Sequence, residues 1–182
     1  MAKRIINSTP KADGFRMPGE FEPQQQVWLV WPERRDVWRD GAYIAQEAYV
    51  RVANAISQFT KVTICASAEQ YNHARTQMPE HIRVVEMSSN DAWVRDSGPA
   101  FLTNNNGELR AVDWDFNAWG GCFYPVDKDQ AISRKIAEIE GRIARLASLM
   151  NSYNEAIEIA NKRVQEKEYL SARAKYTEAL QY

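Results

Sequence analysis

The sequence is poor in the residues that usually build disulfide frameworks and metal sites. Its 182 residues include two cysteines, Cys65 and Cys122, and two histidines, His73 and His81. Two cysteines are too few for the framework of a small secreted domain, so we expect a reducing, cytoplasmic setting. The histidines stand in polar surroundings with no third ligand at metal-site spacing, which favours surface positions over a metal centre.

An excess of charge of one sign and long apolar runs are also missing. Lysine and arginine number 23 against 24 aspartates and glutamates, which gives a net charge of −1. Because nucleic-acid-binding surfaces usually show a basic excess, we expect no nucleic-acid partner. No apolar run approaches membrane-spanning length, and the start MAKRIINSTPK lacks the apolar core of a signal peptide, so no membrane partner is expected.

Glycine and proline are absent after Gly141, and this absence divides the chain. Without helix breakers, the sequence from Lys128 to Tyr182 predicts helix, with one break around 161–168. Apolar stripes within 143–182 predict two helices packed as a hairpin. Their spacing weakly resembles a tetratricopeptide repeat, and an amphipathic hairpin of no particular family accounts for it equally well.

The first region, residues 1–142, predicts alternating strands and helices. Short apolar runs predict strands at 27–32, 62–67 and 82–88, and helical spacing predicts helices at 41–59 and 68–78. A hairpin is expected over 99–116, with Asn106-Gly107 as its tight turn. This order of elements is typical of an α/β domain.

The stretch SSNDAWVRDSGPAF, residues 88–101, places acidic and aromatic side chains just past a predicted strand end. In α/β folds, ligand groups commonly lie at such ends. Asp96 can accept N–H bonds from a guanidinium while Trp93 stacks on the same planar cation. Alternatively, Asp91 or Asp96 pairs with Arg95 and Trp93 belongs to the core. The spacing alone favours this second interpretation.

The remaining candidates carry weaker signals. Cys65 stands within a predicted strand, which predicts a buried structural thiol. Cys122 follows two glycines and is expected on an accessible loop, but no base or electropositive group nearby marks it as reactive. The segment FNAWGG, residues 116–121, is either a mobile substrate loop or a plain turn.

Several long motifs, taken together and in order, resemble the start of bacterial and plant agmatine deiminases. They are STPKADGFRMPGEFEP (8–23), VWLVWPERRDVWRDGA (27–42), VVEMSSNDAWVRDSGP (84–99), VDWDFNAWGG (112–121) and DKDQAISRKIAEIEGR (127–142). The resemblance covers about residues 1–142 and is expected to stop at Arg142. It implies a partial pentein, that is, ββαβ-type units of an α/β propeller. The C-terminal helical hairpin that the apolar stripes predict would follow it.

The resemblance also implies an activity and its residues. The family hydrolyses agmatine to N-carbamoylputrescine and ammonia, for putrescine biosynthesis, through a cysteine–thiouronium intermediate and without metal or organic cofactor. Its N-D-x-W-x-R-D-x-G-P motif gives Trp93 and Asp96 to the guanidinium pocket, with Asp96 as the catalytic carboxylate. Asn117 and Trp119 become substrate contacts. Arg95 is given a structural role, pairing with Asp91.

The chain also departs from the family pattern. The segment CFYPVD after Gly121 is shorter than in the family, and the family's E-G-G glutamate, its His-x-Asp pair and its Gly-Gly-Gly-x-x-His-Cys nucleophile segment have no counterpart. We therefore expect a guanidinium-binding wall without a nucleophile, inactive or nearly so by itself. The alternative is an inactive pentein fragment that binds a protein through its helical tail, and a homo-oligomer stays open.

Overall fold

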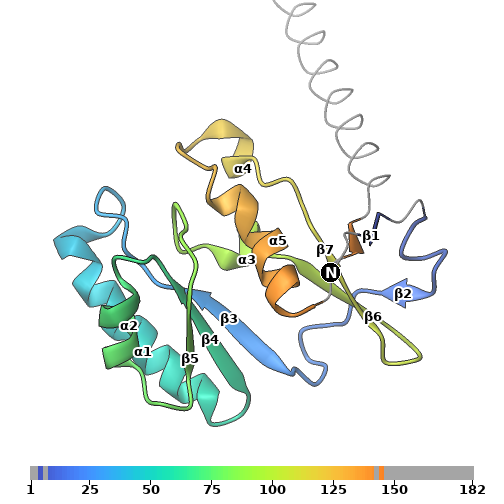
Figure 1. Ribbon diagram of the computed structural model, residues 1–182, viewed down its shortest axis with the longest axis horizontal. Coiled ribbons are helices and arrows are strands. Elements are labelled where there is room, and N and C mark those ends of the chain that lie inside the picture. Colours follow the sequence, from blue (N-terminus) through green and yellow to red (C-terminus); the bar gives the residue numbers. More distant parts are fainter. Residues whose placement is uncertain (1–3, 6–7, 142–143, 146–182) are drawn as a thin grey trace, which may run out of the picture.

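The computed structural model describes residues 4–5, 8–141 and 144–145, and these residues form a mixed α/β fold, as predicted (Figure 1). The strands are β1 (Arg4–Ile5), β2 (Phe15–Arg16), β3 (Gln26–Val30), β4 (Lys61–Ala66), β5 (Arg83–Glu86), β6 (Ala100–Asn104), β7 (Leu109–Val112) and β8 (Ala144–Arg145). The helices are η1 (Arg39–Ala42), α1 (Tyr43–Ser57), α2 (Tyr71–Gln77), α3 (Val94–Ser97), α4 (Ala118–Gly121) and α5 (Asp129–Ile139). The five elements predicted within 27–88 are confirmed, with ends that differ by no more than about three residues.

The parallel sheet β3-β4-β5 is covered by helices on both faces. Its central strand β4 is buried from Val62 to Ala66, as a strand with two covered faces must be. One core, packed against α1 and α2, contains Trp31, Ala53, Val62, Ile64, Ala66, Ala74, Met78, Ile82 and Val84. The other, packed against α5, contains Val30, Cys65, Met87, Ala92, Ile132 and Ile136. The site described below lies where this sheet's strands end.

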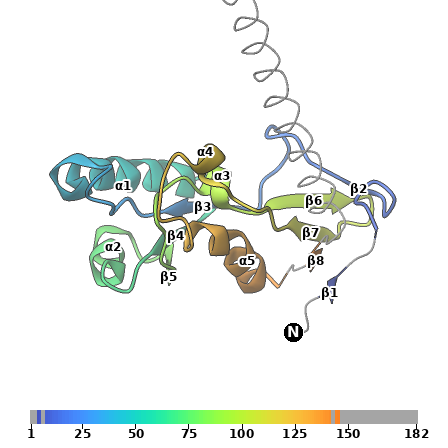
Figure 2. The ribbon, with the colours of Figure 1, turned by 90° about the horizontal axis from the view of Figure 1, so that it is seen from above.

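A second, antiparallel sheet is formed by β2, β6 and β7, and α5 lies between the two three-stranded sheets (Figures 1 and 2). The β6–β7 hairpin is confirmed, but its predicted tight turn is wrong. Gly107 N donates to Asn104 O at 3.1 Å, so Asn105 and Asn106 occupy the turn and Gly107 follows it at φ +75°. The side chain of Asn104 decides this, because its Oδ1 accepts from the backbone of Asn106 and Glu108, both at 3.0 Å.

The predicted helical hairpin at 143–182 lies outside the described residues, apart from Ala144 and Arg145. These two residues form β8, which pairs with β1 in parallel, and are therefore strand where helix was expected. Within the described part of the chain, no helix is long and apolar enough to cross a membrane.

Candidate functional site

Trp93 and Asp96 lie together on a tight turn that follows β5. The backbone N–H groups of Asp96 and Ser97 both donate to Trp93 O at 3.1 Å, which winds this segment into the short helix α3. Trp93 is 44% exposed and Asp96 is exposed, so neither belongs to the core. The interpretation of Trp93 as a core residue is therefore wrong, and the pair stands at an accessible face.

Trp119 reaches this pair from α4, although it lies 23 residues away in sequence from Asp96. Its indole Nε1–H donates to Asp96 Oδ1 at 3.1 Å. Like Trp93, Trp119 is 44% exposed. The structure thus joins two sequence-predicted site residues directly and keeps the third, Trp93, on the same short turn as Asp96.

Asn117, the fourth predicted site residue, is used within its own loop. Its Oδ1 accepts from Gly120 N at 3.1 Å and caps α4. A substrate contact by Asn117 stays a prediction. The segment 118–121 turns with left-handed backbone throughout: φ is +52° at Ala118, +55° at Trp119, +86° at Gly120 and +82° at Gly121. A non-glycine residue costs about 1–2 kcal/mol in this region, so the surrounding contacts must hold Ala118 and Trp119 there.

Trp38 is a neighbour of the site that the sequence analysis did not name. Its ring centroid lies 5.9 Å from that of Trp93, with the planes tilted by 32°. Trp38 comes from the loop that follows β3, so the contact joins two strand ends of the parallel sheet. In the sequence, Trp38 could have been noticed because it lies inside the motif at 27–42. No rule of spacing, however, predicts its contact with Trp93.

Arg95 is exposed at the surface, and its predicted partner is wrong. It forms an ion pair with Glu20 at the surface, whereas Asp91 Oδ1 accepts from Ala92 N at 2.8 Å. The alternative in which Asp91 or Asp96 pairs with Arg95 is wrong as well. Arg95 and Asp96 are adjacent on the α3 turn, and adjacent side chains on a helical turn do not face each other.

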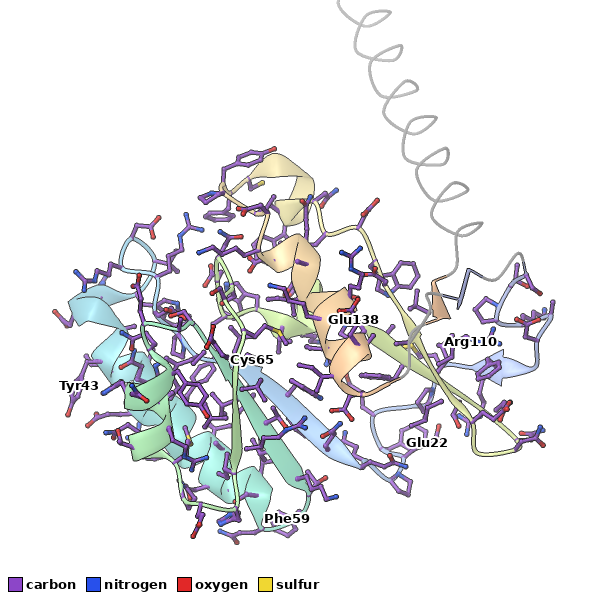
Figure 3. The ribbon with its side chains drawn as sticks, viewed as in Figure 1. Glu22, Tyr43, Phe59, Cys65, Arg110 and Glu138 are labelled. Atoms are coloured by element: carbon purple, nitrogen blue, oxygen red, sulfur yellow. The ribbon has the colours of Figure 1, made fainter. Side chains whose placement is uncertain are left out.

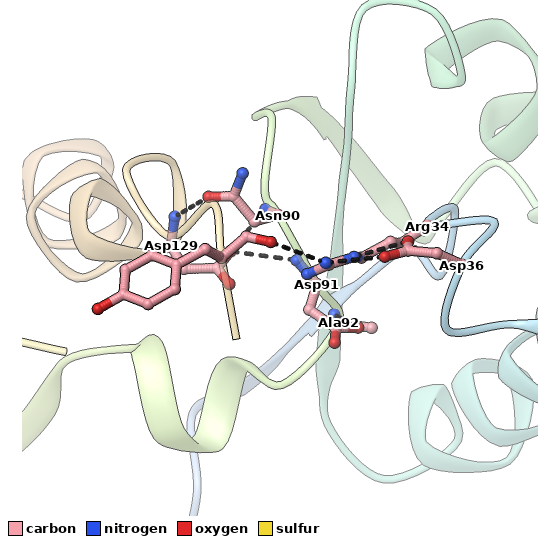
Figure 4. Close-up of polar contacts among 7 residues, drawn as sticks. Arg34, Asp36, Asn90, Asp91, Ala92 and Asp129 are labelled. Carbon is pink, nitrogen blue, oxygen red and sulfur yellow. Dashed lines mark hydrogen bonds and ion pairs between the residues drawn. The ribbon is translucent and has the colours of Figure 1, made fainter. Parts of the chain in front are cut away.

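Behind the α3 turn, Asn90 and Asp129 cap each other's segments (Figure 4). Asn90 Oδ1 accepts from the backbone of Lys128 at 2.8 Å and of Asp129 at 3.1 Å, at the start of α5. In return, Asp129 Oδ1 accepts from the backbone of Asn90 at 2.7 Å and of Asp91 at 3.3 Å. Asp129 is 5% exposed, and this burial raises the pKa of its carboxyl against the opposing effect of the two backbone bonds. The reciprocal caps fix the loop from which α3 starts.

Arg34 ties a third loop to the same region. Its guanidinium donates to both carboxylate oxygens of Asp36, at 2.7 and 2.9 Å, and its Nη2 also donates to Tyr124 O at 3.1 Å (Figure 4). Hydrogen bonding to Asp36 raises the pKa of Arg34, and the nearby charges of Asp91 and Asp129 act in the same direction. The loops after β3 and β5 and the segment before α5 are thereby joined by polar contacts that the sequence analysis missed.

The two cysteines lie in opposite surroundings, as predicted. Cys65 is fully buried beneath α5, and burial raises the pKa of its thiol to about 12 (Figure 3). Cys122 is exposed, and its Sγ–H donates to Trp119 O at 3.2 Å. His73 lies beside Gln46 and His81 beside Ser57, both against α1. Among the described residues, no group of three His, Cys, Asp or Glu side chains could hold a metal ion.

We expect one thiol of the native chain to react rapidly with a thiol reagent and the second to react only after unfolding. The accessible thiolate is the reactive species, and Cys65 is both buried and protonated. Counting thiols with Ellman's reagent, with and without guanidinium chloride, measures this. Cys122→Ser should remove the fast reaction and Cys65→Ser should leave it. Rapid labelling of native Cys122→Ser would contradict the burial of Cys65.

Comparison with known proteins places the chain in a family. The sequence profile of the Porphyromonas-type peptidyl-arginine deiminases matches residues 16–152, and the chain belongs to this family. Within it, the agmatine deiminase of Pseudomonas aeruginosa is 56% identical over 140 residues, covering 74% of this chain and 38% of that protein. The solved agmatine deiminase of Enterococcus faecalis is 55% identical with a TM-score of 0.77, covering 80% of this chain and 41% of its own. The predicted resemblance to agmatine deiminases is confirmed.

Three further findings concern the extent of this relationship. An agmatine deiminase of C. jejuni, solved with substrate bound, matches at 23% identity and a TM-score of 0.60, covering 72% of this chain and 39% of its own, which supports the fold alone. The chain therefore spans about two fifths of the length of the relatives it matches. The profile match also runs to residue 152, beyond the boundary that was predicted at Arg142.

Proposed function

We propose that the chain forms the guanidinium-binding wall of an agmatine deiminase, the N-terminal part of a pentein propeller. The observation that carries the proposal is the contact between Asp96 and Trp119, with Trp93 on the same turn as Asp96. The substrate is a planar cation with N–H groups along its edges and a π face. A carboxylate bonded to one half-exposed indole, with a second on the same turn, matches each of these features.

In the proposed reaction, Asp96 accepts hydrogen bonds from the guanidinium of agmatine, and Trp93 and Trp119 restrict the plane in which it lies. Holding the cation in one orientation presents its central carbon to a nucleophile. A thiolate then attacks this carbon, ammonia leaves, and water hydrolyses the resulting thiouronium to N-carbamoylputrescine. The thiolate and the proton carriers belong to family segments that have no counterpart in this sequence. Such a reaction would serve putrescine biosynthesis in the cytoplasm.

The chain by itself is expected to bind agmatine weakly and to release no ammonia. Cys65 is buried within the core, and the exposed Cys122 donates its Sγ–H to the backbone carbonyl of Trp119. Purified chain incubated with agmatine, and assayed for ammonia and N-carbamoylputrescine, measures turnover. NMR titration of the same sample with agmatine, and with putrescine as the control that lacks the guanidinium, measures binding.

Two outcomes would contradict the proposal in different ways. Turnover that survives Cys122→Ser and Cys65→Ser would show a catalytic group that the sequence analysis missed. Equal shifts with agmatine and putrescine would show that the face binds amines without recognising the guanidinium. The alternative role as an interaction module concerns 143–182, which lie outside the described residues. Light scattering on the chain with and without this segment tests that role.

A further inference from the structure

Trp119 is held in place by contacts on several sides of its ring and backbone. Its ring packs edge-to-face against Phe116, with centroids 5.2 Å apart, and against Phe123, with centroids 5.8 Å apart. Edge-to-face packing fixes the tilt of an aromatic ring more tightly than apolar contact alone. Phe116 is in turn 9% exposed, and its carbonyl accepts from Gln130 Nε2 of α5 at 3.0 Å. The indole is therefore anchored to the helix beneath it.

The backbone around Trp119 is constrained to the same degree. Gly121 N donates to Asn117 O at 2.8 Å, and Cys122 N donates to Ala118 O at 2.9 Å, so two bonds close the left-handed turn. Ala118 is 1% exposed and fixes the middle of the turn in the core. A left-handed conformation at Trp119 persists only where such contacts over-determine it. The turn sets the direction in which the indole N–H points.

The indole N–H of Trp119 points at Asp96, whose side chain has few other contacts. The side chain of Asp96 is exposed, and within the described part of the chain Trp119 Nε1 is the one hydrogen-bond donor to its carboxylate. The bond engages Oδ1 and leaves Oδ2 without a donor among these residues. An exposed carboxylate on a short turn would otherwise sample several rotamers. One neutral donor fixes it without cancelling its charge.

We propose that Trp119 is a positioning residue for Asp96: its indole N–H holds Oδ1, so that Oδ2 is presented to the guanidinium of the substrate. This inference rests on the proposed function and gives Trp119 a role through Asp96 in addition to its proposed contact with the substrate. The left-handed turn at 118–121 orients the indole N–H of Trp119 toward Asp96. Asn117 caps this turn through its side chain and so helps to hold Trp119 in place without contacting Asp96.

The first test uses the full chain without ligand. The indole N–H resonance of Trp119 in a ¹H–¹⁵N spectrum, assigned by its loss in Trp119→Phe, should move upfield and exchange faster with solvent in Asp96→Ala. The matched control is Asp115→Ala, which removes an exposed carboxylate from the segment that leads into α4 and Trp119. It should leave the Trp119 resonance in place. A Trp119 resonance that does not respond to Asp96→Ala would overturn the inference.

The second test titrates the same chain with agmatine. Trp119→Phe should weaken binding about tenfold, the lower end of what a hydrogen bond to a charged group contributes. An analogue at position 119 with sulfur in place of the indole N–H keeps the ring packing and should weaken binding as much. Trp114→Phe, the same change at a tryptophan that is 40% exposed, should stay within about twofold of the unchanged chain.

The outcomes distinguish the positioning role of Trp119 from the proposed binding of agmatine. If the sulfur analogue binds agmatine as tightly as the unchanged chain, the N–H has no role and the inference is wrong. If the Trp119 resonance responds to Asp96→Ala but the chain binds no agmatine, the positioning contact stands and the proposed function of the chain is contradicted. A response in both tests supports both.

Discussion

Asp96→Ala is expected to lower kcat/KM for agmatine by about 10²–10⁴-fold in a chimera that joins residues 1–141 of this chain to the remaining segment of the Enterococcus faecalis agmatine deiminase. The chimera itself should hydrolyse agmatine, because the two proteins are 55% identical over the shared region and superpose with a TM-score of 0.77. Steady-state release of N-carbamoylputrescine measures both parameters.

The size of this effect follows from leaving a cation half paired. We expect the added segment of the chimera to cover the site, and removing one partner of a buried charge pair costs about 3–5 kcal/mol. Each 1.36 kcal/mol corresponds to about tenfold in rate, which gives the expected range. In the proposed reaction Asp96 binds the guanidinium and also orients it for attack, so its loss should raise KM and lower kcat.

Controls separate loss of the contact from loss of the fold. Asp115→Ala removes an exposed carboxylate from the segment before α4 and should leave kcat/KM within about twofold. Asp96→Asn keeps the size of the side chain and should restore little activity, since the charge is missing. The guanidinium role of Asp96 is wrong if Asp96→Ala retains full kcat/KM while the chimera is active.

Asp129→Ala is expected to destabilise the chain by about 2–4 kcal/mol, the largest effect on stability that a polar residue near the site should produce. Its Oδ1 accepts from the backbone N–H groups of Asn90 and Asp91, and the side chain is 5% exposed. Alanine leaves both part-buried backbone donors without a partner, at about 1–2 kcal/mol each, toward the lower end of the usual cost. Urea unfolding followed by circular dichroism measures the change.

Asp129→Asn is the matched control, because both backbone bonds end on the same oxygen. An asparagine whose carbonyl takes the place of Oδ1 keeps both bonds and removes the charge. We expect its stability at neutral pH to equal or exceed that of the unchanged chain. Equal destabilisation by Ala and Asn would mean that the charge, and not the two bonds, is what the site needs.

The same carboxyl predicts a dependence on pH. Burial raises the folded-state pKa of Asp129 above its ordinary value, so the folded chain holds this proton to higher pH than the unfolded chain does. The contribution to stability is therefore greatest below the unfolded pKa and falls as pH rises through the folded pKa. Asp129→Asn should lack this step, which unfolding curves across the acid range can measure.

Much of the fold could be predicted from local patterns. The strands at 27–32, 62–67 and 82–88 follow from short apolar runs, and the helix at 41–59 from its apolar spacing, because these patterns reflect which faces must leave water. The turn at Asn104–Gly107 could not be predicted correctly. The Asn106-Gly107 signal was overridden by the side chain of Asn104, whose two backbone bonds move the turn by one residue.

The sequence by itself determined the family and the α/β class, and it predicted two site residues three positions apart, Trp93 and Asp96. These depend on local order along the chain, which motifs record directly. Only the tertiary structure decided that Trp119 donates to Asp96, that Asn117 caps its own loop, and that Asn90 and Asp129 cap each other across 39 residues. Such contacts join polar side chains whose segments meet only after the apolar faces of the sheet and α5 have packed, and no local spacing encodes that meeting.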